Sequence, residues 1–215
     1  METSLDNDCA EIMDVCMTRR LSFVFILLFS ATVSSKTLLI LGDSLSAGYE
    51  MPIEQAWPSL LADALAEKGK TVSVVNGSIS GDTTGNGLAR LPSLLTQHTP
   101  DAVLIELGAN DGLRGFPPTT VSTNLATMIE QIQAQNTAVI LMQIRIPPNY
   151  GKRYSDAFYQ VYPNLAQQFA IPLIPFFLEQ VILKPEWMMS DGLHPKPEAQ
   201  PWIADFVAEQ IANDL

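Results

Sequence analysis

The chain has 215 residues, with 12 basic and 23 acidic side chains, and its formal net charge at pH 7 is −11. This acidic balance, without any block of basic residues, argues against binding driven by nucleic-acid phosphates. A hydrophobic fraction of 47% and a charged fraction of 16% are ordinary for a globular protein, and the length fits one domain plus extra segments.

The beginning of the chain does not have the pattern of a packed domain. Residues 17–35, MTRRLSFVFILLFSATVSS, place two arginines before an apolar run and small residues, which is typical of a signal peptide cleaved before Lys36. The apolar run is short for a bilayer span, although an uncleaved membrane anchor is the alternative. Residues 1–16 are acidic and contain no basic residue, which does not suit the start of a signal peptide. We therefore predict that 1–16 are a mis-called extension, that Met17 is the true start, and that the mature protein is periplasmic or secreted.

Residues 36–215 are expected to form a single domain. Both cysteines of the sequence, Cys9 and Cys16, lie outside this range, so the mature chain has no disulfide available. A chain of this size buries enough apolar surface to fold without one.

Short apolar runs alternate with amphipathic stretches along this range. The alternation predicts an α/β fold with three layers, in which helices cover both faces of a doubly wound parallel sheet of five strands. The expected strand order is the flavodoxin-like 2-1-3-4-5. The expected strands are residues 37–42, 71–77, 101–108, 137–144 and 171–177, of which the last, marked by proline, suits a sheet edge. The expected helices are 56–69, 87–98, 119–136, 155–170 and 197–214, with Gly69 as a C-cap and Pro92 near the start of its helix or at a kink.

Sheets of this kind place their sites at the carboxyl ends of the strands. Polar loops follow every expected strand, so the topology predicts that they meet at one edge. These loops are Gly42-Asp43-Ser44, NGSISGDTT (76–84), GANDGLRG (108–115), RIPPNYGKRY (145–154) and, before the last helix, SDGLHP (190–195).

Ser44 is the candidate nucleophile of this edge. Its hydroxyl would lie at the start of a helical turn, although a lone Gly-Asp-Ser, taken without other evidence, is better explained as a turn or helix cap. A serine nucleophile needs a base, and the spacing Asp-x-x-His lets Asp191 orient the imidazole of His194 toward Ser44. An Asp-Gly turn alone would also explain this loop. His98 ends an expected surface helix, where a polar residue needs no catalytic explanation.

Three hydrogen-bond donors are candidates for an oxyanion hole, which stabilises charge in the transition state of acyl transfer. They are the backbone N–H groups of Ser44 and Gly81 and the side-chain amide of Asn110. Glycine and asparagine are also ordinary turn residues. Their joint placement at the predicted edge is what favours the catalytic interpretation.

Four motifs occur in the order in which they occur in the SGNH hydrolase superfamily, and the chain resembles this family nearly from end to end of 36–215. GDSLSAGY resembles the GDSL block, NGSISGDTT the glycine block, GAND the Gly-x-Asn-Asp block and DGLHP the Asp-x-x-His block. The resemblance implies the SGNH hydrolase fold, the triad Ser44, His194 and Asp191, and an oxyanion hole of Ser44, Gly81 and Asn110. It also implies hydrolysis of acyl thioesters, lysophospholipids and carboxylic esters, including aryl esters, through an acyl-enzyme and without a metal or organic cofactor.

Two alternatives remain open at this point. One is a carbohydrate acetyl esterase of the same fold, and the other is a flavodoxin-like anion-binding module, which would need neither Asp191 nor His194. Phe116, Ile146 and Tyr150 are tentative substrate-binding residues, because they lie in loops at the predicted edge, although they would also serve to cap the sheet. The expected partners are small acyl substrates, with no nucleic acid and no stable membrane span after signal cleavage, and we expect a monomer.

Overall fold

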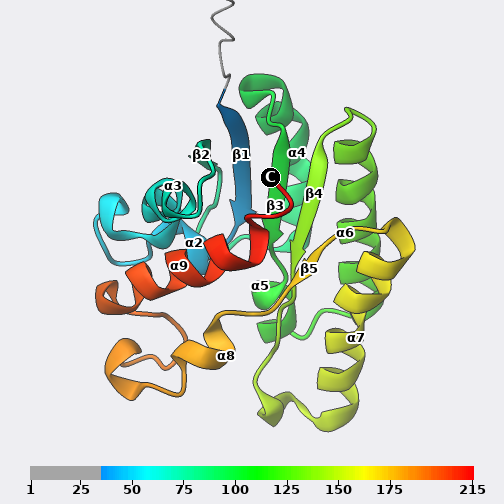
Figure 1. Ribbon diagram of the computed structural model, residues 1–215. Helices are drawn as coiled ribbons and strands as arrows, with labels where there is room; N and C mark the ends of the chain where they lie inside the picture. The colour runs from blue at the N-terminus through cyan, green and yellow to red at the C-terminus, as the bar shows by residue number, and fades with distance from the viewer. Residues whose placement is uncertain (1–34) are drawn as a thin grey trace, which may run out of the picture. The chain divides into compact units, whose positions relative to one another are not determined.

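The computed structural model describes residues 35–215 (Figure 1). The predicted extension and nearly all of the predicted signal peptide lie outside these residues, so both stay predictions, as do the domain boundaries built on them. Among residues 35–215, none of the helices combines the length and apolar character that crossing a bilayer would require.

Five parallel strands form one sheet in the order β2-β1-β3-β4-β5, which confirms the predicted topology (Figure 1). The strands are β1 (Lys36–Gly42), β2 (Val72–Asn76), β3 (Ala102–Glu106), β4 (Ala138–Met142) and β5 (Leu173–Ile174). The central residues of β1, β3 and β4 are buried and apolar because helices cover both faces of the sheet, whereas β2, at the edge, is only partly buried.

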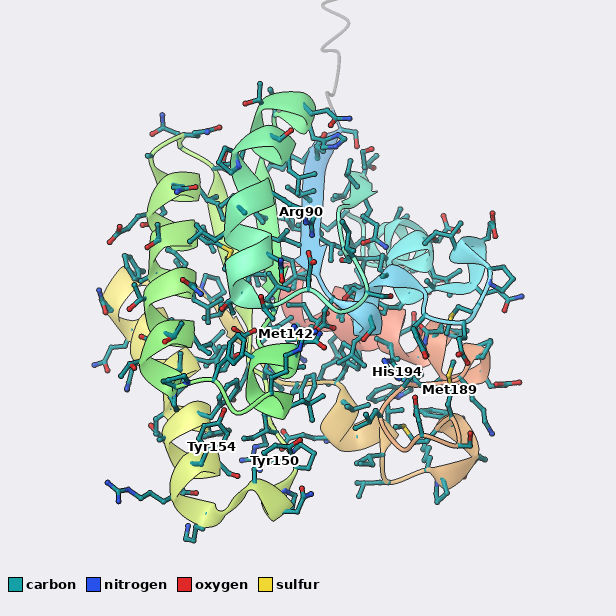
Figure 2. The ribbon with its side chains drawn as sticks, turned by 180° about the vertical axis from the view of Figure 1, so that it is seen from behind. Arg90, Met142, Tyr150, Tyr154, Met189 and His194 are labelled. Atoms are coloured by element: carbon teal, nitrogen blue, oxygen red, sulfur yellow. The ribbon has the colours of Figure 1, made fainter. Side chains whose placement is uncertain are left out.

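Helices cover the two faces in separate groups. On one face α3 packs against α9, and on the other α4 packs against α6, which in turn packs against α7 (Figures 1 and 2). The helices are α2 (Ser44–Ala47), α3 (Trp57–Glu67), α4 (Thr84–His98), α5 (Ala109–Leu113), α6 (Pro118–Gln133), α7 (Lys152–Phe169), α8 (Leu178–Val181) and α9 (Gln200–Ile211). Short 3₁₀ turns lie at Ile53–Gln55, Pro148–Tyr150, Pro185–Trp187 and Pro197–Ala199.

Trp57 joins three parts of the chain that border the functional edge. Its side chain is fully buried. Its indole Nε1 donates to the carbonyl of Leu45, 3.0 Å away, and its backbone N–H donates to Oε1 of Gln200 at 2.9 Å. The turn after β1 is therefore tied to α3 and to the start of α9.

Two of the differences from the sequence prediction have a clear local cause. β5 has only two residues, because Pro172 and Pro175 flank it and proline has no N–H to donate to a neighbouring strand. α4 begins earlier than expected, at Thr84, because Thr83 and Asn86 form a capping box there. Pro92 therefore lies in the interior of α4 rather than near its start.

Candidate active site

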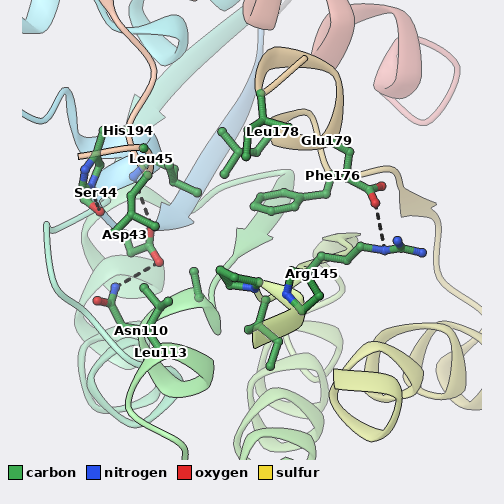
Figure 3. A pocket seen from close by; sticks show the side chains of 17 residues that line it. Asp43, Ser44, Leu45, Asn110, Leu113, Arg145, Phe176, Leu178, Glu179 and His194 are labelled. Carbon is green, nitrogen blue, oxygen red and sulfur yellow. Dashed lines mark hydrogen bonds and ion pairs between the residues drawn. The ribbon is translucent and has the colours of Figure 1, made fainter. Parts of the chain in front are cut away.

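Ser44, His194 and Asp191 form a continuous chain of contacts at the carboxyl edge of the sheet. His194 Nε2 lies 2.9 Å from Ser44 Oγ, and His194 Nδ1 lies 2.6 Å from Asp191 Oδ2. Ser44 begins α2, directly after β1, whereas His194 comes from the loop before α9, and Figure 3 shows the two side chains together at one end of a pocket. The fold thus brings together all three residues that the sequence singled out for this chemistry.

The loop that carries Asp191 fixes which ring nitrogen of His194 carries the proton. Burial raises the pKa of Asp191, but hydrogen bonds from the ring of His194 and from the backbone N–H groups of Leu193 and His194 outweigh it and lower that pKa to about 2. The carboxylate is therefore ionised at neutral pH. Because it accepts only, the proton of a neutral imidazole sits on Nδ1, and Nε2 is left to accept the hydroxyl proton of Ser44.

The turn that carries Ser44 depends on a close approach of backbone to side chain. A Cβ on Gly42 would lie 2.7 Å from Glu106 Oε2 and 2.9 Å from the side chain of Ser46, so only glycine fits there. Asp43 then caps α2, with its Oδ1 accepting from the N–H of Leu45 at 3.1 Å. The side chain of Ser44 is consequently held at the first position of the helix.

Two buried carboxyl groups lie behind this turn. Glu106 Oε2 accepts from Ser46 Oγ at 2.7 Å and from the N–H of Asp43 at 3.4 Å. Burial, reinforced by the nearby Asp43 carboxyl, raises the pKa of Glu106 well above its ordinary value. Burial likewise raises the pKa of Asp43 to about 6, although hydrogen bonds from Leu45 and Asn110 favour its charged form. The back of the site therefore holds acid groups that resist ionisation.

The three candidate oxyanion donors differ in whether they already donate to an acceptor within the protein. Asn110, near the start of α5, donates from Nδ2 to Asp43 Oδ2 at 3.1 Å and to the carbonyl of Asp82 at 3.0 Å. Within residues 35–215, the backbone N–H groups of Ser44 and Gly81 donate to no acceptor. Two free donors and one amide shared between protein oxygens are thus available to a ligand.

Two arginines hold the loop that contains Gly81. Arg114 donates from Nη2 to the carbonyl of Gly81 at 3.1 Å. Arg90 donates from Nε and Nη2 to Asp82 Oδ2, at 2.9 and 2.6 Å, and from Nη1 to the carbonyl of Gly77 at 2.9 Å. A guanidinium fork of this kind fixes the loop at both ends. The sequence analysis did not single out either arginine.

A pocket of about 350 Å³ opens beside Ser44 (Figure 3). Its wall is mainly apolar, and at the end away from Ser44 the Nε of Arg145 lies 2.8 Å from Oε1 of Glu179. The apolar side chains of the wall are Leu45, Ala109, Leu113, Ile146, Pro147, Pro148, Phe176, Leu178, Ile182 and Leu193. Such a wall suits the hydrocarbon part of a ligand.

Of the tentative substrate-binding residues, the structure places only Ile146 in this pocket. Phe116 and Tyr150 are not among the residues that line it. Tyr150 turns its hydroxyl to the carbonyl of Leu113, 3.0 Å away, and packs near Tyr154, apart from His194 in Figure 2. Tyr154 in turn donates to the carbonyl of Phe116 at 2.7 Å. Tyr150 and Tyr154 thus hold these loops in place. Other residues of the same loops line the pocket, namely Leu113, Ile146, Pro147 and Pro148.

Much of the pocket wall was not anticipated from the sequence. Phe176, Leu178 and Ile182 come from the segment after β5. The signal in the sequence for this part of the wall is the position of residues 175–182 directly after a strand, where sites of parallel sheets lie. His98 takes no part in the site. It is the last residue of α4, whereas the opposite end of that helix, at Thr84, contacts Asp111 near the site. Residues 35–215 contain no group of three or more His, Cys, Asp or Glu side chains placed to hold a metal ion.

An open parallel sheet with serine, histidine and aspartate aligned at its carboxyl edge is the arrangement of an α/β serine hydrolase. The comparison with known families agrees, because the GDSL-like Lipase/Acylhydrolase family matches residues 40–200. The chain belongs to this family of SGNH hydrolases and is an enzyme of that class.

Several characterised proteins are similar to the chain over most of its length. An arylesterase of Vibrio mimicus is 67% identical over 200 residues, which are 93% of this chain and 100% of the relative. Thioesterase 1/protease 1/lysophospholipase L1 of Escherichia coli strain K12 is 54% identical over 192 residues, 89% of this chain and 91% of the relative. The crystal structure of the psychrotrophic esterase EstA from Pseudoalteromonas sp. matches with a TM-score of 0.80 and 44% identity, covering 83% of this chain and 98% of that one.

Proposed function

We propose that Ser44, His194 and Asp191 are the catalytic triad of a hydrolase that cleaves acyl thioesters, lysophospholipids and carboxylic esters. The observation that carries the proposal is the continuous contact from Ser44 Oγ through both ring nitrogens of His194 to the carboxylate of Asp191. An anion-binding module would have no use for a histidine held in this way. The substrate classes are those named for the relatives, and the apolar pocket supports their transfer to this chain.

The reaction begins when Ser44 Oγ attacks the carbonyl carbon of the substrate and His194 Nε2 takes the hydroxyl proton. Asp191 stabilises the imidazolium that results. The imidazolium then protonates the leaving thiol or alcohol as the acyl–Ser44 ester forms. Water, deprotonated by the same histidine, cleaves that ester and regenerates the enzyme. Both halves balance with proton and acyl transfers alone.

The negative charge on the carbonyl oxygen is stabilised by the N–H groups of Ser44 and Gly81 and by the amide of Asn110. The two backbone donors are free in the absence of substrate, so they offer their full strength to the oxyanion. The amide of Asn110 already donates to Asp43 and to the carbonyl of Asp82. A charged oxygen competes better for these hydrogens than a neutral carbonyl does, so Asn110 favours the transition state over the bound ester.

The pocket beside Ser44 is where the acyl chain binds. Its volume, about 350 Å³, falls in the range of small-molecule sites, and its wall is mainly apolar. An acetyl group would leave most of that wall without contacts, which disfavours a carbohydrate acetyl esterase. We further propose that the enzyme is a monomer and that it acts outside the cytoplasm. The proposed location rests on the signal-like pattern in residues 17–35.

The test measures hydrolysis of p-nitrophenyl esters from acetyl to palmitoyl, followed by palmitoyl-CoA and a lysophospholipid, with Ser44→Ala as the matched control. The variant should lose about 10³-fold or more in kcat. Faster hydrolysis of longer chains supports the acyl-chain pocket, while activity confined to acetyl esters favours the carbohydrate esterase. Undiminished hydrolysis by Ser44→Ala would exclude Ser44 as the nucleophile.

A further inference from the structure

The imidazole of His194 is held on three sides, and only two of these belong to the triad. Its two nitrogens contact Ser44 and Asp191, so only the faces of the ring remain to be positioned. The ring of Tyr49 stacks on one face, with 4.1 Å between the ring centroids and 23° between the planes. Nothing in the sequence analysis assigned a role to Tyr49.

The backbone around Tyr49 is bent in a way that presents its ring to the histidine. Gly48 ends α2 with a φ of +78°, and Glu50, which is not glycine, has a φ of +52°. The N–H of Met51 donates back to the carbonyl of Gly48 at 3.3 Å, which closes the turn over Tyr49. A residue other than glycine in the left-handed region costs conformational energy, and such residues concentrate at functional sites.

We propose that Tyr49 is a positioning residue for His194, which fixes the plane of the imidazole and stabilises the imidazolium formed during acyl transfer. The face of an aromatic ring carries partial negative charge and attracts a cation that lies over it. The charged imidazolium therefore gains more from the stack than the neutral imidazole does. The proposal rests on the proposed function, in which His194 takes the proton of Ser44.

Other charged groups around His194 act in the same direction but are not part of the stack. Asp191 faces Nδ1 from the histidine's own loop, Asp43 lies behind Ser44, and Glu50 follows Tyr49 in the turn. The phenol hydroxyl of Tyr49 hydrogen-bonds to the side chain of Glu50, and Tyr49→Phe removes this bond while it keeps the ring. The phenol hydroxyl is not needed for the stack, so phenylalanine should replace tyrosine.

The experiment compares Tyr49→Leu with Tyr49→Phe. Tyr49→Leu should lower kcat and should move the acid limb of the pH profile of kcat/KM to lower pH by about 0.4 to 0.7 pH unit. The sign follows because a less stabilised imidazolium forms only at lower pH. Tyr49→Phe should keep the wild-type profile. A purely structural role would lower kcat in the leucine variant without moving the limb, and that result overturns the proposal.

A second measurement does not depend on activity. In the full-length Ser44→Ala protein, the titration of His194 is followed by NMR with and without Tyr49→Leu, and His98, the other histidine of the sequence, serves as the internal reference. The midpoint for His194 should fall by a similar amount while that of His98 stays constant. An unchanged midpoint for His194 refutes the role of Tyr49, whatever the kinetics show. Should Tyr49→Leu fail to fold, Tyr49→Met provides the same comparison. A failure of the proposed function itself is a separate result, because it would appear as undiminished hydrolysis by Ser44→Ala.

Discussion

Two aspartates, Asp43 and Asp191, lie on either side of the contact between Ser44 and His194, and their surroundings push them in opposite directions. Asp43 is fully buried behind the nucleophile, and its pKa is raised to about 6, chiefly by burial. The side chain of Asp191 is 37% exposed, and hydrogen bonds that outweigh its burial lower its pKa to about 2. The same chemical group thus serves as a scaffold on one side and as a fixed negative charge on the other.

The comparison shows that the site divides two roles between its carboxyl groups: those on the buried side hold neighbouring groups in place, and the one on the exposed side supplies a negative charge. On the buried side, carboxyl oxygens organise N–H groups, those of Leu45 and Asn110 on Asp43 and that of Asp43 on Glu106. On the exposed side, the carboxylate stays ionised because water and three hydrogen bonds solvate it. Substitutions on the two sides should therefore differ in what they damage.

The largest expected effect is that of Asp191→Asn. The amide cannot accept from Nδ1 as a charged group does, and it allows the imidazole to adopt the wrong tautomer. We expect kcat to fall by about 10³- to 10⁴-fold with little loss of thermal stability. Steady-state kinetics on a p-nitrophenyl ester, together with a thermal unfolding curve, check this expectation. A loss of less than tenfold would show that the exposed carboxylate does not orient the base.

A smaller effect is expected for Asp43→Asn. The asparagine oxygen still accepts from the N–H of Leu45, but its NH₂ group then faces the amide of Asn110, so two donors oppose each other. Displacement of Asn110 should lower kcat by about 10- to 100-fold, less than the loss of about 10²- to 10³-fold expected for Asn110→Ala.

The matched control for Asp43→Asn is the double variant with Asn110→Ala. If Asp43 acts through Asn110, the double variant should be no slower than Asn110→Ala alone. Additive losses would instead indicate that Asp43 affects catalysis by another route.

The smallest effect is on the pH dependence of the free energy of unfolding. The buried side and the exposed side change this free energy in opposite directions as pH rises. Glu106 binds its proton more tightly in the folded protein than in the unfolded chain, so the free energy of unfolding falls as pH rises above the ordinary value of 4.5. Asp191 behaves oppositely, because its contribution is present above 3.8 and is lost as pH falls through about 2. Urea unfolding at a series of pH values measures both trends.

Glu106→Gln should remove the contribution of Glu106 to the first trend. It should leave the contribution of Asp43, whose pKa is also raised, and it should leave the second trend. The glutamine oxygen keeps the hydrogen bonds from Ser46 and Asp43, while its nitrogen occupies the place of Oε1, which has no partner among the described residues. The variant should therefore gain stability relative to the wild type as pH rises above 4.5, by at most about 1.4 kcal/mol per pH unit. A constant difference between the two proteins across this range would contradict the raised pKa of Glu106.

The sequence predicted the parts of the molecule that follow from local pattern. The strand order and the loops that meet at the carboxyl edge come from the alternation of apolar and amphipathic segments together with the rule for parallel sheets. The placement of Ser44 near His194 is an outcome of that topology. The length of β5 and the start of α4 were harder to predict, because single proline and capping residues decide them.

Other features depend on packing that no periodicity reveals. Glu106 did leave a signal, since it is a charged residue in the otherwise apolar run AVLIELG, but the pattern alone does not say which group it contacts. The stack of Tyr49 on His194 depends on the turn at Glu50, and glutamate has no special preference for that backbone conformation. The pocket wall contributed by Phe176 and Leu178 requires knowing how the chain continues after β5.

The hydrogen bonds of Trp57 have an optical consequence. The sequence has three tryptophans, and Trp57 alone of them is fully buried, whereas the rings of Trp187 and Trp202 are partly exposed and lie 5.7 Å apart. A water-soluble quencher therefore suppresses emission from the exposed pair and leaves the emission of Trp57. Because its indole donates to the carbonyl of the residue after the nucleophile, the remaining light comes from a chromophore attached to the catalytic turn. The protein thus carries a native fluorescent reporter of its own active-site geometry.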